Sequence, residues 1–94
     1  MGRRYLYKLS KLRDLSWGIW DPIGMKESRV HCEDEYDAYL IRVIGMFTED
    51  VPKSEIVAYL IEVESEHMGL GINPTTRFRA EQLVGAIMQY QKTL

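Results

Sequence analysis

The chain has 94 residues and a net charge of -2, with 46% hydrophobic residues, 28% charged residues and a single cysteine. This length predicts one domain over residues 1–94, and the composition is that of an ordered globular protein. The charge balance excludes bulk attraction to nucleic acid or to an anionic membrane, and a lone cysteine excludes an internal disulfide.

The pattern of apolar residues predicts a cytoplasmic protein. No apolar run approaches the roughly 18 residues of a transmembrane helix. Charges at Arg3, Arg4, Lys8 and Lys11 interrupt the N-terminal region before an apolar run forms, so we expect no signal peptide. The single thiol, Cys32, also suits a reducing compartment.

A first amphipathic helix is predicted over about residues 4–18. Apolar side chains recur there in helical phase, at Tyr5, Leu6, Leu9 and Leu12, and the phase extends to Trp20. Gly18 weakens the helix, and Asp21 should end it because a residue before proline avoids the α region. The segment 21–24 fits a type I turn, and residues 25–33 are expected to form a loop.

A second helix is predicted over about residues 35–47. Asp34 is the expected N-cap, and Asp37, three residues later, is the expected partner in a short capping box. One face of this helix carries Tyr36, Tyr39, Leu40, Val43, Ile44 and Phe47. Arg42 falls on the opposite, solvent-facing side.

The third helix is predicted over about residues 52–68, with Pro52 in its first turn. Its apolar arc is wide, which suits a helix packed on two sides. Glu55, Glu62 and Glu66 share a narrow outer stripe with Tyr59, whereas Glu64 and His67 fall inside the apolar arc. Gly69-Leu70-Gly71 is expected to end the helix as a glycine C-cap.

The fourth helix is predicted over about residues 76–92, with Asn73, Thr75 or Thr76 as N-cap. Its apolar face is formed by Ala80, Leu83, Val84, Ile87 and Tyr90. Phe78 lies off that face, and we expect it to cover the helix end. The complete pattern predicts an all-α fold, an antiparallel four-helix bundle with basic outer helices and acidic inner helices.

Several spaced motifs carry a resemblance over residues 6–90. They are Trp20-Asp21-Pro22-Ile23-Gly24, Asp34-Glu35-Tyr36-Asp37 with Tyr39-Leu40, Ser54-Glu55-Ile56 with Tyr59-Leu60, and Glu64 with Met68-Gly69-Leu70. In combination the chain resembles the YugE-like family of small bacterial proteins of unknown function. The resemblance implies an antiparallel four-helix bundle and brings no activity, cofactor or catalytic residue. Trp17-Gly18 and His31-Cys32 depart from the family pattern.

Two patterns suggest chemistry and also have structural explanations. Asp21, Asp34 and Asp37 would converge if the end of the first helix packs on the start of the second, and such a carboxylate group suits a hard divalent cation. Capping and turn formation explain the same residues without a ligand. Glu64-x-x-His67 has the spacing of a di-iron bundle ligand pair, but the chain holds only one such pair.

Glu64 is therefore expected to be a partly buried structural carboxylate. Its predicted partner is a tyrosine, a tryptophan N–H or an arginine such as Arg79, because an unpaired buried carboxylate is costly. His67 is expected at the helix end. His31-Cys32 lacks the geometry of a nucleophile with its base, and no cofactor is predicted.

The sequence favours a non-enzymatic protein-interaction module, with immunity-like, antitoxin-like or regulatory roles as possible forms. The expected partner is another protein or a second copy, with neither nucleic acid nor membrane involved. The alternative is a small-ligand or divalent-metal-binding protein using Asp21, Asp34 and Asp37. The candidate partner- or ligand-binding residues are Trp20, Asp21, Asp34, Tyr36, Asp37, Glu55, Glu62, Glu64 and Glu66.

Overall fold

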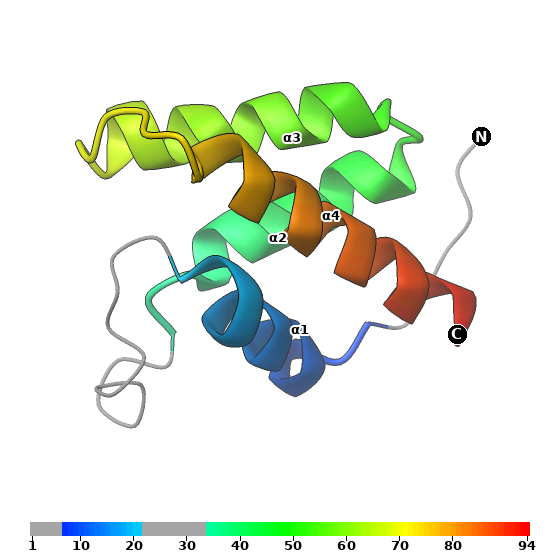
Figure 1. Cartoon of the computed structure of the whole chain (residues 1–94). Helices are drawn as coiled ribbons and strands as arrows, with labels where there is room; N and C mark the ends of the chain where they lie inside the picture. The colour runs from blue at the N-terminus through cyan, green and yellow to red at the C-terminus, as the bar shows by residue number, and fades with distance from the viewer. Residues whose placement is uncertain (1–6, 22–33) are drawn as a thin grey trace.

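The computed structural model describes residues 7–21 and 34–94, and these ranges contain helices and no strand (Figure 1). A compact all-α domain of four helices is therefore confirmed, with a radius of gyration of 12.7 Å. The elements are α1 (Leu9–Leu15), the π-helical turn η1 (Ser16–Trp20), α2 (Asp37–Thr48), α3 (Lys53–Glu62), the π-helical turn η3 (Val63–His67) and α4 (Thr76–Lys92).

The fourth helix organises the packing. Figure 1 shows α4 crossing between α3 on one side and α1 on the other, with α2 behind it. The contacts of α4 are most extensive with α3 and η1, and α2 contacts α3. These contacts partly support the predicted bundle packing.

Helical periodicity explains which side chains form the core. On α4, Ala80, Leu83, Val84 and Ile87 are all fully buried, as the predicted face requires. Leu40 and Val43 are buried on α2, and Ile56, Val57 and Leu60 are buried on α3. Each large aliphatic side chain buried in this way contributes about 1.5–3 kcal/mol. The spacing of apolar residues thus determines which side of each helix faces inward.

The end of the first helix differs from the prediction. Regular α-helix ends at Leu15, and the chain continues as a π-helical turn to Trp20, closed by the Asp21 N–H donating to the Ser16 carbonyl at 2.8 Å. The wider turn brings both Trp17 and Trp20 into the core. Residues 4–6, the proposed turn after Asp21 and the loop 25–33 lie outside the described residues.

The predicted N-terminus of the second helix was wrong in its details. The N-cap residue is Tyr36 and no side chain caps the helix. Asp34 contributes only its backbone carbonyl, which accepts the Asp37 N–H at 3.1 Å. The carboxylate of Asp37 binds Arg13 instead, because a bidentate contact with a cation is stronger than a capping bond to an amide.

The last two helices follow the sequence closely. Pro52 is the N-cap of α3 and not part of its first turn, since its ψ of 143° is extended. Gly69 follows η3 at a φ of 68°, as a glycine C-cap requires, and α4 covers the predicted residues 76–92. The prediction for Phe78 was wrong: this side chain is 61% exposed, because its position on α4 points away from the buried face.

Candidate functional site

Three aromatic side chains form a cluster where η1 packs on the start of α2. The Tyr36 ring lies 4.8 Å from the Trp17 ring and 5.3 Å from the Trp20 ring, measured between centroids. All three are at most 1% exposed. Each such aromatic pair contributes about 0.5–1.5 kcal/mol beyond its buried area. Trp20 therefore anchors the end of the first helix, in the phase that the sequence assigned to it, and is buried instead of being available to a partner.

Asp21 connects this cluster to solvent. The Tyr36 hydroxyl donates to Asp21 Oδ1 at 2.7 Å, a charge-assisted bond between the end of η1 and the start of α2. Asp21 has a φ of 27°, in the left-handed region that aspartate tolerates better than most residues. Two of the predicted site residues, Asp21 and Tyr36, thus meet, and the bond between them is architectural.

Arg13 binds the carboxylate of Asp37, another of the predicted site residues. Its Nε donates to Asp37 Oδ1 at 3.0 Å, and its Nη2 donates to Oδ2 at 2.6 Å. Both side chains are about one-fifth exposed. The fork geometry fixes α1 against the first turn of α2, where a negative charge also suits the helix dipole.

Glu64 is the most deeply buried carboxylate among the described residues, with 1% of its surface exposed. Its Oε2 accepts from Arg79 Nη2 at 2.8 Å and from the Thr76 hydroxyl at 3.0 Å. The predicted pairing with Arg79 is confirmed. Arg79 also donates through Nη1 to the Trp20 carbonyl at 3.4 Å, a longer bond. One arginine of α4 therefore joins η3 to η1.

The position of Glu64 also has an electrostatic reason. Thr76 is the first residue of α4, so the carboxylate lies beside the positive end of that helix dipole. Its second oxygen, Oε1, and the Trp20 indole N–H are buried and find no hydrogen-bond partner in the part of the chain that the structure describes. Arg79 connects the two residues that carry these atoms, since it binds both Glu64 Oε2 and the Trp20 carbonyl.

His67 does not join Glu64 as a ligand pair. It is exposed at the end of η3, and its Nε2 lies 3.9 Å from Glu62 Oε1. Across residues 7–21 and 34–94, no group of three or more histidine, cysteine or acidic side chains is arranged to hold a metal ion. Asp21 and Asp37 have separate partners and Asp34 is exposed, so these ranges lend the divalent-metal alternative no support.

The acidic residues of the third helix lie at the surface. Glu55, Glu62 and Glu66 are exposed, and we call these three residues the acidic face. Within the described ranges, Glu55 and Glu66 have no ion-pair partner, and Glu62 has only the long contact with His67. The negative charge of this surface is thus largely uncompensated by neighbouring side chains.

Tyr59 is half-buried beside the acidic face. Burial raises the pKa of its hydroxyl above the usual 10.0, and the nearby Arg42 guanidinium partly offsets that rise. Arg42 itself is exposed on α2. Arg42 of α2 and Glu55 of α3 border the same groove, so the outer surfaces of the two helices meet here.

A groove of about 440 Å³ separates α2 from the start of α3. Its walls combine apolar and charged side chains: Ile41, Arg42, Gly45, Met46, Glu49, Val51 and Glu55. Ile41 is 66% exposed and also borders a smaller apolar hollow of about 270 Å³ beside Leu9 and Leu12. Leu9, which lines the smaller hollow with Ile41, is 40% exposed, so this side of the molecule has exposed apolar area on both α1 and α2.

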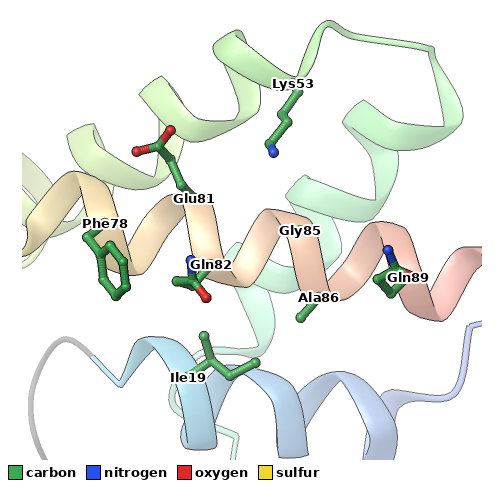
Figure 2. Close-up of a pocket in the computed structure, with 8 residues that line it drawn as sticks. All are labelled: Ile19, Lys53, Phe78, Glu81, Gln82, Gly85, Ala86 and Gln89. Carbon is green, nitrogen blue, oxygen red and sulfur yellow. The ribbon is translucent and has the colours of Figure 1, made fainter.

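A second hollow, of about 540 Å³, lies along the exposed side of α4. Figure 2 shows Phe78, Gln82 and Ala86 on the side of α4 that faces Ile19 of η1, with Lys53 and Glu81 on the opposite side. Gly85 has no side chain at this point. The hollow is broad and its charges are mixed, so it indicates no particular ligand.

The sequence did not single out Ile41 or Gly45 as surface features. Ile41 belongs to the β-branched run Ile41 to Ile44, which fits the helical phase as a whole. The signal that could have found them was position: Ile41 and Gly45 share the side of the helix with Arg42, opposite the apolar face. An isoleucine on the side of a helix opposite its apolar face is expected to be exposed, whereas an isoleucine on the apolar face is expected in the core.

No helix among the described residues is long and apolar enough to cross a membrane. The chain matches no family model, no curated protein and no solved structure.

Proposed function

We propose that this protein acts by binding another protein through the acidic face on α3 and η3, and that it has no catalytic role. The observation that carries the proposal is the set of three exposed carboxylates, Glu55, Glu62 and Glu66, on one side of the third helical segment. Because neighbouring cations do not neutralise them, a basic partner surface would gain electrostatic attraction without breaking internal ion pairs.

The surroundings of these carboxylates support a protein partner. Tyr59 supplies an aromatic side chain beside the charges, and Ile41 supplies exposed apolar area across the α2–α3 groove. Interfaces commonly combine an apolar or aromatic centre with a charged rim. Neutralisation of a basic partner, as small immunity or antitoxin-like proteins achieve, is one form of this function.

The way in which the four helices pack together is also part of this proposal. We take the four helices to form an antiparallel bundle of the YugE-like type, in which cross-helix ion pairs hold the register. The Arg13–Asp37 and Arg79–Glu64 contacts support this view, since each joins an outer basic helix to an inner acidic segment. The rigid bundle would present α3 as a fixed charged surface.

A charge-reversal experiment tests the proposal. The bait is the purified protein, and the double variant Glu62→Lys/Glu66→Lys reverses two charges on the acidic face. The matched control, Glu35→Lys/Glu81→Lys, makes the same change in net charge at two exposed positions elsewhere. Partners captured from extracts of the source cells are identified by mass spectrometry, and their affinities are then measured with purified components.

We expect a basic partner that is retained by the wild type and the control and lost from the double variant. At about 0.2–1 kcal/mol for each exposed pair, two lost pairs weaken the dissociation constant by about 2-fold to 30-fold. Binding should also weaken as salt rises. A partner that binds the double variant as tightly as the wild type would contradict the proposal.

A further inference from the structure

The outer side of α2 has features that the fold of the single chain does not require. Its exposed residues repeat at helical spacing: Ala38, Ile41, Arg42, Gly45, Thr48 and Glu49. We call this set the α2 stripe. Ile41 stands above the surface between two hollows of about 440 and 270 Å³, so the stripe has a ridge and adjacent space for a similar ridge.

Gly45 lies at the centre of this stripe, in the interior of α2. A glycine there costs about 0.8–1 kcal/mol relative to alanine. A Cβ atom at Gly45 would meet no atom within 4 Å, so no described neighbour prevents a larger residue. A missing side chain instead lets a second helix approach the α2 backbone closely, and the open groove beside Gly45 provides the space.

The charges of the stripe are self-complementary about Gly45. Arg42 lies three residues before Gly45 and Glu49 lies four residues after it. Neither has an ion-pair partner within residues 7–21 and 34–94. If a second α2 crosses at Gly45 in the antiparallel direction, the Arg42 of each copy faces Glu49 of the partner subunit. Parallel pairing would oppose like charges.

We propose that the α2 stripe is a homodimer interface, on which a second copy of this chain packs its own α2 about a two-fold axis at Gly45. A two-fold axis brings the same patch of both copies together, so the patch must complement itself. The α2 stripe does so in charge, through Arg42 and Glu49, and in shape, through the Ile41 ridge and its adjoining hollows.

The symmetry of these charges indicates that the partner is a second copy of the chain. A different protein would require no internal symmetry of charge, whereas a second copy requires opposite charges on the two sides of the crossing point. Since one helix from each copy forms the centre of the contact, the interface is small, and we expect association in the micromolar range. Both proposals use Ile41 and the groove beside it, but Glu62 and Glu66 lie outside the stripe, so substitutions at these two positions test the basic partner separately from the homodimer.

Sedimentation velocity over a concentration series tests the assembly. For the wild type, we expect the mass to rise from 11.0 kDa toward twice that value. Gly45→Gln should remain monomeric, because a long neutral side chain at the crossing point keeps the helices apart. Gly85→Gln is the matched control: Gly85 also lies in a helix, and a Cβ added there would meet nothing within 4 Å, but it is on α4. The control should dimerise like the wild type.

A charge exchange tests the geometry. Arg42→Glu and Glu49→Arg should each weaken self-association by about tenfold or more, since each places like charges opposite one another. An equimolar mixture of the two variants should recover association as a heterodimer, because the opposite charges then face each other again. Circular dichroism checks that every variant keeps the helical content of the wild type.

Three results would overturn the inference. The first is a wild-type protein that stays at 11.0 kDa up to millimolar concentration. The second is a dimer that persists in Gly45→Gln. The third is a mixture of the charge variants that associates no more than either variant alone. Loss of the basic partner from the acidic-face variant would leave all three measurements unchanged, so the two proposals fail separately.

Discussion

Replacing Arg79 by methionine should destabilise the protein more than any exposed substitution on α4. The change removes the donor to Glu64 Oε2 at 2.8 Å and the longer bond to the Trp20 carbonyl. Glu64 is 1% exposed, so its carboxylate would remain buried with only the Thr76 hydroxyl as a partner. The variant thus isolates the cost of an uncompensated internal charge.

The magnitude follows from the burial of the pair. Removing one partner of a buried ion pair costs about 3–5 kcal/mol. Because 22% of the Arg79 side chain is exposed and water can partly replace it, we expect the lower end, about 3 kcal/mol. In a domain of this size that corresponds to a fall in Tm of about 12–24 °C. A total stability of about 5–14 kcal/mol leaves the variant folded at low temperature.

Urea unfolding and differential scanning calorimetry provide the measurements. Arg77→Met is the matched control, because Arg77 is exposed one turn or less away on the same helix, and it should change stability by less than about 0.5 kcal/mol. The double variant Glu64→Met/Arg79→Met removes both charges and should recover most of the loss. Two results would refute the reasoning: a loss of less than about 1 kcal/mol in Arg79→Met, or a double variant as unstable as the single one. Either result would show that Arg79 does not stabilise the fold by compensating the buried Glu64 charge.

Three further predictions concern other contacts. Tyr36→Phe removes the 2.7 Å bond to Asp21 and should lower the unfolding free energy by about 1.5–3 kcal/mol in urea titrations. Burial raises the pKa of Tyr59 in the folded protein. The stability linked to the neutral phenol is therefore complete below pH 10.0, and it is lost as the pH rises through the pKa of Tyr59 in the folded state. Arg42→Gln should raise that pKa further in an ultraviolet titration, because it removes a nearby positive charge. Gly69→Ala forces alanine to a φ of 68° and should cost about 1 kcal/mol by thermal unfolding.

Each of these predictions has its own control. Tyr90→Phe removes a hydroxyl that accepts an exposed backbone N–H, and its smaller effect should separate it from Tyr36→Phe. Tyr59→Phe should abolish the late-titrating component, and an unchanged titration would show that the raised pKa belongs to another tyrosine. Gly85→Ala places the same substitution at a helical position and should stabilise the protein slightly; equal losses at Gly69 and Gly85 would contradict the conformational explanation.

Local signals in the sequence were sufficient for most of the fold. The spacing of Ala80, Leu83, Val84 and Ile87 identified the buried face of α4, and Gly69 marked the end of η3. These features depend on neighbours within a turn or two of helix, so periodicity and backbone preference reveal them. The sequence also suggested Arg79 as the partner of Glu64, because a carboxylate on an apolar face requires a cation or donor.

The candidate site was harder to predict because its residues have partners distant in sequence. Asp37 looked like a capping residue, yet Arg13 of another helix binds it. Trp20 and Tyr36 were candidates for contact with a partner, but they pack on one another and are buried. Helix capping is a local competition that a strong long-range ion pair overrides once the helices meet.

Helical phase alone was enough to specify the class of fold, the inward faces of the four helices and the exposure of Glu55, Glu62 and Glu66. The packed arrangement of the helices was needed to show that two π-helical turns meet at Arg79, that Asp21 bonds to Tyr36, and that Ile41 forms a ridge beside a groove. Those features depend on the distances between helices. Interhelical distances are set when the whole core packs, and no short stretch of sequence specifies them.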